Sequence, residues 1–365
     1  MIIDTTLREG FQLFNTYFDN EEKKEIIKSL AASGIEEIEA GWTGMKGIDE
    51  LFKWSGEKIE NSIISVWSPC RQKDIELAAD YRIKRINIGV PSSKQHIEKR
   101  LETTKEELLE RVSANVRKAS LSGMEVTVGF EDLYGADFDF IKKAIKAVKS
   151  NGGFRIRFSD TRGLVSPLMA GDLISFFRNE TDLEIGVHFH NDFGLASGNS
   201  VAALEKGADY TDASILGIGE RSGITPLEEI ASRLVVMNRN NYNLIEIKNL
   251  CIKVSKLADI KISRIKAFAG KDIFSCESGI HVHAIGKDPL LMEPYPPELT
   301  GEKRKTAIGL KTGKAAVKNL IGKTGIMLKD PQFEMLVENI KNLSLDKKRP
   351  LDKNELKLLI ENQAV

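Results

Sequence analysis

The sequence predicts a parallel (β/α)8 TIM barrel over residues 1–260, followed by a linker and a small, mostly helical subdomain over residues 261–365. Two observations favour the barrel. Eight short β-like runs alternate with longer amphipathic stretches from the first residue onward, which is typical of parallel strands joined by helices. The rival architecture is a doubly wound open sheet, but no GxGxxG motif follows the first predicted strand.

The predicted strands and helices follow one another in regular order. Glycine stands after several helical patterns, at the position where a helix would end. The strands are predicted at Met1–Thr5, Glu36–Ala40, Ile63–Trp67, Arg85–Val90, Glu125–Phe130, Arg155–Ser159, Ile185–His190 and Thr211–Gly217. Helices between them include Asn20–Ser33, Thr104–Ser122, Asp137–Ser150 and Ser197–Lys206, and the glycines are Gly34, Gly123, Gly152 and Gly207.

The alternation of strands and helices stops near residue 260. Lys261–Glu302 is predicted to be a linker, because four prolines interrupt its second half. The helical patterns that follow would bury too little surface to fold independently, so they are expected to pack over a barrel mouth. These helices are predicted at Lys314–Ile321, Pro331–Leu343 and Asn354–Glu361.

Composition narrows the class of protein. Basic and acidic residues are equal at 53 each, so no net charge attracts nucleic acid or a membrane surface. Cys70, Cys251 and Cys276 lack zinc-finger spacing and suit a reducing compartment. The apolar start at Met1–Asp4 is too short for a signal peptide, and no apolar stretch of 18 residues follows. We therefore expect a cytoplasmic globular enzyme.

Polar residues gather at the predicted ends of five strands. Active sites of such barrels lie at the carboxyl ends of the strands. One polar strand end alone could be a capped turn, where Asp, Ser and Thr are common, but five on one face predict an active site. These segments are Asp4–Gly10, Gly129–Asp132, Ser159–Gly163, His188–Asp192 and Gly217–Gly223.

A two-histidine, one-carboxylate set is the sharpest prediction within these segments. Four of the five histidines form two His-x-His pairs, and a strand directs His188 and His190 to the same face. Together with Glu9 they would leave coordination positions open, which suits Mg²⁺, Mn²⁺, Zn²⁺ or Fe²⁺ acting as a Lewis acid. Arg8, beside Glu9, would either bind a substrate carboxylate or oxyanion or form a salt bridge at the barrel mouth.

These motifs together resemble the homocitrate synthase and isopropylmalate synthase enzymes of the DRE-TIM metallolyase superfamily. Asp4–Gly10 is similar to the family's opening motif in its homocitrate-synthase form, with glutamate after the arginine. His188–Ala196 resembles the metal strand, and Leu216–Leu227 resembles the strand-8 signature. Glu277–His283 is similar to the segment that supplies a catalytic histidine from a neighbouring subunit. The resemblance covers essentially the whole chain.

The resemblance implies an acyltransferase that performs a Claisen condensation of acetyl-CoA with a 2-oxo acid. It also implies a divalent metal ion as cofactor and a homodimer. Glu9, His188 and His190 would bind the metal. The other implied roles are polarisation of the keto oxygen or binding of the 1-carboxylate by Arg8, a hydrogen bond to that carboxylate from Thr161, and proton transfers at acetyl-CoA by Glu131 and His281.

The sequence departs from the lysine-pathway pattern near the substrate. The strand-5 arginine and serine that grip the far carboxylate of 2-oxoglutarate are absent, so Arg162 is predicted to supply part of the missing charge. The acceptor stays open, with 2-oxoglutarate first, then oxaloacetate, as in Re-type citrate synthase, and pyruvate, as in citramalate synthase. The departures are Thr127 and Gly129 on strand 5, Trp67 in place of a histidine, Gly186 in place of a glutamate, and Met292 in place of a tyrosine, with Tyr295 three residues further on.

Two other classes compete with the synthase. A metal-dependent aldolase or lyase of the same superfamily would share the barrel and the histidine pair, but it has no need of Glu277–His283. A non-catalytic relative is conceivable because Met292 replaces the tyrosine. A complete metal and acid–base set argues against that reading.

Overall fold

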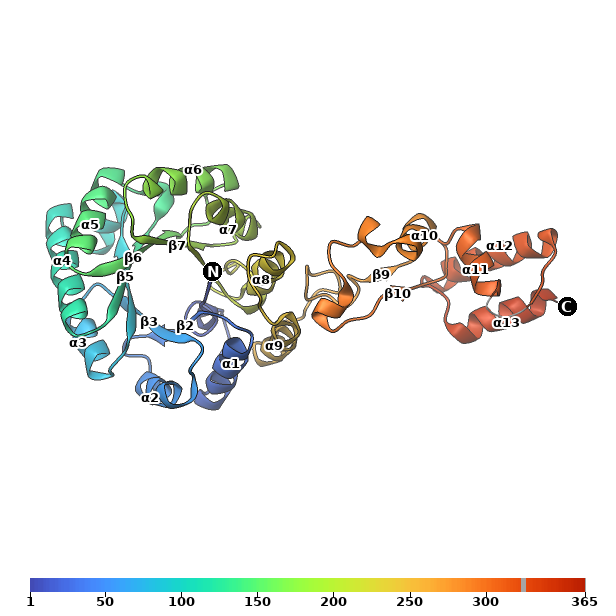
Figure 1. Ribbon diagram of the computed structural model, residues 1–365, viewed down its shortest axis with the longest axis horizontal. Helices are drawn as coiled ribbons and strands as arrows, with labels where there is room; N and C mark the ends of the chain where they lie inside the picture. The colour runs from blue at the N-terminus through green and yellow to red at the C-terminus, as the bar shows by residue number, and fades with distance from the viewer. Residues whose placement is uncertain (323–325, 365) are drawn as a thin grey trace. The chain divides into compact units, whose positions relative to one another are not determined.

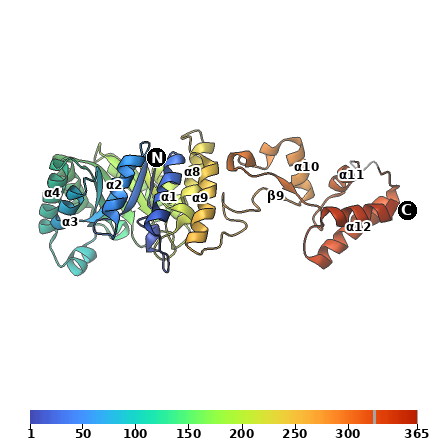
Figure 2. The same ribbon diagram turned by 90° about the horizontal axis from the view of Figure 1, so that it is seen from below.

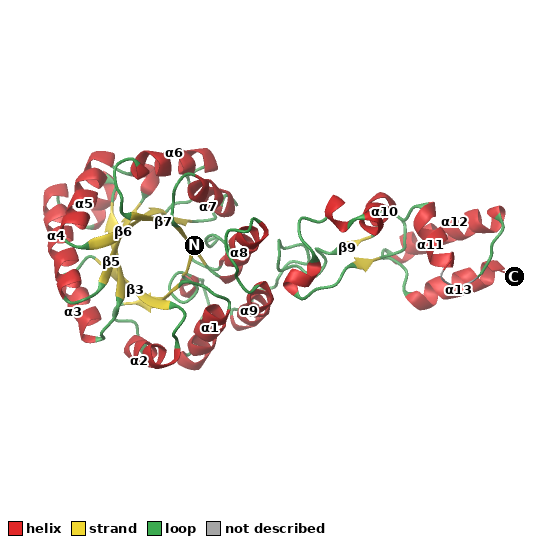
Figure 3. Ribbon diagram, viewed as in Figure 1, coloured by secondary structure: helices red, strands yellow, loops and turns green. Residues whose placement is uncertain are grey.

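The computed structural model describes residues 1–322 and 326–364, and the chain forms two units, 1–262 and 263–365. The first unit is a closed barrel of eight strands in sequential order, in which β8 pairs in parallel with β1 (Figures 1 and 3). The predicted barrel is confirmed. Its strands are β1 (Ile2–Asp4), β2 (Glu37–Trp42), β3 (Ile63–Pro69), β4 (Arg85–Pro91), β5 (Glu125–Glu131), β6 (Gly153–Asp160), β7 (Glu184–Phe189) and β8 (Tyr210–Ala213).

Nine helices of this unit form an outer ring around the strands, and α1 and α9 lie side by side (Figures 1 and 2). Local signals set their ends. Asp19 and Thr104 form capping boxes at the starts of α1 and α4. All four glycines predicted to end helices have positive φ angles, between 82° and 109°. The helices are α1 (Asn20–Ala32), α2 (Ile48–Lys58), α3 (Gln72–Asp80), α4 (Lys105–Leu121), α5 (Phe138–Ser150), α6 (Pro167–Arg178), α7 (Ala196–Glu205), α8 (Leu227–Val236) and α9 (Leu244–Leu257).

Strand β8 is shorter than the predicted Thr211–Gly217. The chain leaves the sheet after Ala213 and makes a 3-10 turn, Ile215–Gly217, in which Leu216 has a φ of 58°. The hydroxyl of Ser214 stabilises this turn by donating to the carbonyl oxygen of Ile218 at 2.6 Å. The loop that follows then folds back on the turn, because the Ile224 amide donates to the Gly217 carbonyl oxygen.

Charged side chains fill the barrel interior, where apolar branched residues are usual. Glu37 on β2 accepts hydrogen bonds from Arg85 on β4 at 2.6 Å and from Arg155 on β6 at 2.7 Å. The Arg155 guanidinium also lies 3.9 Å from the centroid of the Tyr210 ring. Each of these buried charges has an opposite charge beside it, as burial in a low dielectric requires.

The three helices predicted near the C-terminus are confirmed in the second unit. They are α11 (Lys314–Gly322), α12 (Asp330–Lys347) and α13 (Lys353–Ala364). Its small apolar core includes Val317, Leu336 and Ile340. The predicted linker contains a further helix, α10 (Gly279–Lys287), and a two-stranded sheet of β9 (Ser275–Cys276) and β10 (Lys305–Thr306). In neither unit do the described residues include a helix long and apolar enough to cross a membrane.

Candidate active site at the barrel mouth

A cavity of about 470 Å³ lies at the carboxyl ends of the strands. It is built by the turn after β1 and by the ends of the strands from β2 to β7, together with the loop after β8. Its wall combines two tryptophans with acidic, basic and imidazole groups, as expected for a site that binds a small polar molecule. The lining includes Trp42, Trp67, Glu131, Arg157, Thr161 and His188.

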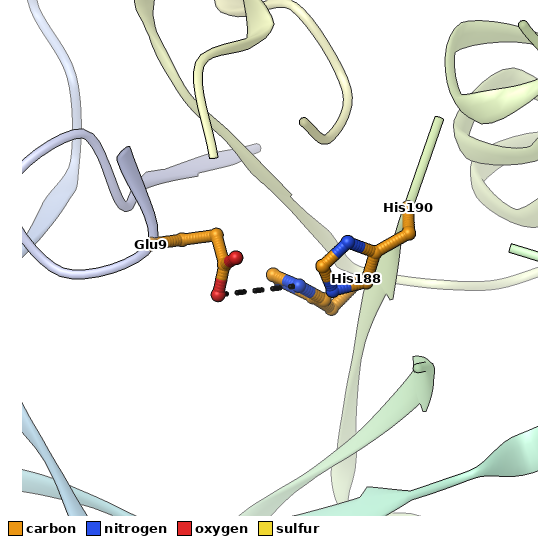
Figure 4. Close-up of side chains that lie close together, drawn as sticks. All are labelled: Glu9, His188 and His190. Carbon is orange, nitrogen blue, oxygen red and sulfur yellow. Dashed lines mark ion pairs between the residues drawn. The ribbon is translucent and has the colours of Figure 1, made fainter. Parts of the chain in front are cut away.

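The three predicted metal ligands come together in this cavity. Glu9, His188 and His190 are buried, and each offers one ligand atom within 4.8 Å of the others. Figure 4 shows the Glu9 carboxylate turned toward the two imidazoles, with Nε2 of His188 at 4.0 Å from Oε2 of Glu9. Glu9 lies in the turn after β1, His188 near the end of β7, and His190 just beyond it.

A carboxylate behind His188 fixes the orientation of its ring. Nδ1 of His188 lies 2.9 Å from Oδ2 of Asp212 on β8, which leaves Nε2 directed at Glu9. Sequence reasoning missed Asp212, although strand alternation from Tyr210 would have turned it into the barrel. Nδ1 of His190 is buried and has no hydrogen-bond partner among the described residues, so the site leaves an imidazole nitrogen for a further ligand.

Burial and neighbouring charge prepare all three groups for metal binding. Burial holds the pKa of His188 well below its usual value and also lowers the pKa of His190, so both imidazoles stay neutral. Burial opposes ionisation of Glu9, but the Arg8 guanidinium lowers its pKa overall. Two neutral imidazoles and one carboxylate fit a divalent cation with open coordination positions.

Arg8 is held by carboxylates on both sides. It donates to Glu9 through Nη1 and to Oε2 of Glu39 through Nε at 2.5 Å, and its Nη2 lies 3.8 Å from Oδ2 of Asp212. The salt bridge predicted at the barrel mouth is therefore present. Arg8 also lines the cavity, so its positive charge faces whatever the cavity binds.

Glu131, at the end of β5, and Thr161, directly after β6, also line the cavity. Arg100 binds the Glu131 carboxylate; sequence reasoning missed this arginine, which gives no local signal beyond its charge. The Oγ1 atom of Thr161 accepts a hydrogen bond from the Asp132 amide at 2.9 Å. Its own hydroxyl proton has no acceptor among the described residues, so it is available to a ligand.

Arg162 and His281 are the remaining predicted residues. Arg162 does not line the cavity; its Nε donates to Oδ1 of Asp132 at 2.9 Å, and its side chain is 45% exposed. His281 belongs to the second unit, where it is exposed on α10. Because α10 is helical, His281 and His283 do not share a face as a strand pair would.

A barrel with two histidines and one carboxylate at its mouth is typical of metal-binding (β/α)8 proteins. The comparison with known proteins supports this class. The HMGL-like family profile matches residues 1–260, and the profile for a homocitrate synthase post-HMGL domain matches residues 268–348. An HMG-CoA lyase structure from Bacillus subtilis has a TM-score of 0.65 at 19% identity, covering 72% of this chain and 94% of that one. At 19% identity this similarity shows a shared fold and nothing more.

Two relatives illustrate the match over the whole length. A 2-isopropylmalate synthase of Caldanaerobacter subterraneus is 30% identical over 100% of this chain and 96% of its own. A homocitrate synthase of Frankia sp. is 33% identical over 97% of this chain and 88% of its own. The protein belongs to the homocitrate synthase and 2-isopropylmalate synthase family of the DRE-TIM superfamily.

Proposed function

We propose that this protein is an acyltransferase that condenses acetyl-CoA with a 2-oxo acid and then hydrolyses the resulting thioester with water, and that the acceptor is 2-oxoglutarate, giving homocitrate and CoA. One observation carries the proposal: the buried set Glu9, His188 and His190 shares a cavity with a cation, Arg8, and a carboxylate, Glu131. The relatives, named as homocitrate synthases and 2-isopropylmalate synthases, support this reaction class.

The acceptor end of the reaction uses the metal ligands and their neighbours. A divalent cation, when bound by Glu9, His188 and His190, would supply Lewis-acid polarisation of the keto group. Arg8 places a fixed positive charge beside the oxygen that becomes an alkoxide. Thr161 donates its free hydroxyl proton to the 1-carboxylate of the acceptor.

The acetyl-CoA end requires a base for the methyl proton and an acid for the product. Glu131 is the base in this proposal, and its salt bridge with Arg100 keeps the carboxylate oriented in the cavity. His281, from the second unit of a partner subunit in a homodimer, serves the other proton transfer.

Thiol release from acetyl-CoA across a panel of 2-oxo acids tests the proposal. We expect release with 2-oxoglutarate, loss of release after exhaustive chelation, and recovery when Mg²⁺ or Mn²⁺ is added back. His188→Ala and His190→Ala should abolish turnover while circular dichroism shows an intact barrel. Faster turnover of pyruvate than of 2-oxoglutarate or oxaloacetate would overturn the homocitrate assignment. Full activity after chelation would overturn the metal site.

The aldolase or lyase alternative is weaker because of the second unit. A profile built on the post-HMGL region of homocitrate synthases matches residues 268–348, and such a region is not required for lyase chemistry in the barrel. The thiol-release assay separates the two classes, because a lyase cleaves its acyl-CoA substrate without needing an acceptor acid.

A further inference from the structure

Arg157 stands among glycines in the inward-facing layer of the barrel just below the metal ligands. In the sheet register it lies opposite Gly129 on β5 and opposite Gly186 on β7. The next strand, β4, presents Gly89 opposite Gly129. Three neighbouring positions therefore lack side chains, and the cavity extends down to Gly129 and the arginine.

Buried polar atoms without partners face the space beside Gly129. Arg157 is 3% exposed, and its recorded bonds leave only from Nη1, to Asp212 at 2.6 Å and to Glu39 at 3.3 Å. Its Nε has no partner among the described residues, and the same holds for Oδ1 of Asn87. A Cβ added to Gly129 would lie 3.2 Å from that Oδ1 and 3.5 Å from Nε of Arg157, so both atoms border one small space.

A third such atom lies on the same face of β5. Thr127 is two residues before Gly129, its side chain is buried, and its Oγ1 has no partner among the described residues. Leaving a buried polar group unpaired costs about 1–3 kcal/mol, and more when the group is charged. The two unpaired atoms beside Gly129, a donor on Arg157 and an acceptor on Asn87, are typical of a site completed by a ligand.

We propose that the space beside Gly129 is the subsite for the far carboxylate of a dicarboxylic 2-oxo acid, with Arg157 as the charged anchor. This inference rests on the proposed function and deepens it by naming the residue that binds this carboxylate. Nε of Arg157 donates to a carboxylate oxygen, whereas Oδ1 of Asn87 can only accept and lies at the edge of the subsite. A guanidinium held in a dry site binds a carboxylate strongly, because hydrogen bonds between charged groups gain strength in a low dielectric.

The surrounding walls direct an acceptor toward this subsite. On the strand-3 side, the Trp67 ring lies across Gly89, where an added Cβ would be 2.6 Å from Cζ2 of the indole. That ring closes the space between β3 and β4, while Gly129 leaves the space beside β5 and β6 open. Through Asp212, Arg157 is also linked to His188, so the subsite lies one hydrogen-bonded residue away from the metal ligand.

Arg157 is therefore the alternative to Arg162 for charge complementation. The Arg162 guanidinium is bonded to Asp132, half-exposed and outside the cavity lining. Arg157 keeps an unpaired donor, is buried, and lines the cavity. Of the two arginines, only Arg157 presents a buried cation with an unpaired donor to a ligand.

The test compares two acceptors of the same shape. Calorimetry on the Mg²⁺-loaded protein, without acetyl-CoA, measures binding of 2-oxoglutarate and of 5-methyl-2-oxohexanoate, in which an isopropyl group replaces the far carboxylate. Arg157→Met should weaken binding of 2-oxoglutarate roughly 10- to 100-fold and change binding of the isostere by less than about threefold. Gly129→Ala keeps the ion pair with Asp212 but fills the space, so it should weaken binding of both acids, which have the same shape.

Each other outcome counts against the subsite. Unchanged or equally weakened binding of both acids in Arg157→Met would overturn the subsite, and equal weakening would mean that Arg157 acts only through Asp212 and the metal ligands. Unchanged binding of both acids in Gly129→Ala would show that the acceptor does not occupy the space beside Gly129. If Arg157→Met does not fold, Gly129→Ala decides whether the acceptor reaches this space. A selective loss in Arg162→Ala without one in Arg157→Met would transfer the role to Arg162. Selective binding together with absent thiol release would contradict the proposed function but support the subsite.

Discussion

Oδ2 of Asp212 lies 2.9 Å from Nδ1 of His188, on the side of the imidazole opposite the nitrogen that faces Glu9. The same oxygen accepts a hydrogen bond from Arg157 at 2.6 Å, and burial raises the pKa of Asp212 to about 6. One carboxylate thus holds both the ligand that would bind metal and the arginine proposed to bind substrate.

Asp212→Asn should weaken metal binding without removing a ligand. The amide can keep a contact with Nδ1 of His188 but loses the charge that holds the ring, and such supporting groups typically contribute 10- to 100-fold in affinity. Titration with Mn²⁺ measures the change, and Asp182→Asn, at an exposed carboxylate, is the control. An unchanged Mn²⁺ affinity would contradict the supporting role.

His281 should act in trans if the second unit serves a partner's barrel. His281→Ala and Glu9→Ala subunits are each expected to be inactive, since each lacks one essential group. Mixing them creates one hybrid site that has both residues, so some activity should return. Exchange is followed by fluorescence transfer between labelled subunits, and exchange without recovery would argue for sites contained in one chain.

Asp4 should make the metal-free protein less stable as pH rises from 4 to 7. Burial raises the pKa of Asp4 from 3.8 to about 7, although Thr6 donates two hydrogen bonds to its carboxylate. A group whose pKa is raised on folding stabilises the fold fully below its unfolded pKa, and this contribution is lost as pH rises through the folded pKa. The upper bound is about 4 kcal/mol. Urea unfolding of Asp4→Asn should show a smaller decline, whereas exposed Asp346→Asn should follow the wild type.

Gly223→Ala should disturb the loop after β8 and, through it, the metal site. Gly223 has a φ of 77°, and an added Cβ would lie 1.8 Å from the carbonyl oxygen of Gly217, a backbone atom that cannot move alone. This loop supplies the Glu220 amide that donates to Oε1 of Glu9 at 3.2 Å. We expect a loss of at least about 1–3 kcal/mol in the free energy of unfolding and weaker metal binding.

The control for this variant is Gly123→Ala. Gly123 has a similar φ of 82° with open space around it, so the variant reports backbone strain alone. Equal destabilisation of the two variants in urea would show that the contact with Gly217 contributes nothing.

Local patterns predicted the barrel and the metal triad because both depend on short-range periodicity. His188 and His190 share a face through strand alternation, and Glu9 follows the first strand directly. The interior network was not predicted, because the contacts of Asp212 and Arg157 join strands far apart in sequence and depend on register around the closed barrel. Helix α10 was not predicted, because it is short and contains two glycines, which disfavour helix formation.

The ion pairs across the barrel floor limit how its strands can be exchanged between proteins. Glu37 on β2 neutralises Arg85 on β4 and Arg155 on β6 at once. A chimera that receives β2 from a donor with an apolar residue at this position would leave two guanidinium groups buried without their shared anion. Removing one partner of a buried pair costs up to about 3–5 kcal/mol, and the partly exposed carboxylates of Glu125 and Glu184, which also bind Arg85 and Arg155, would offset part of this cost. Exchanging β2 together with β4 and β6 would keep the pairs with Glu37, whereas exchanging β2 alone would not.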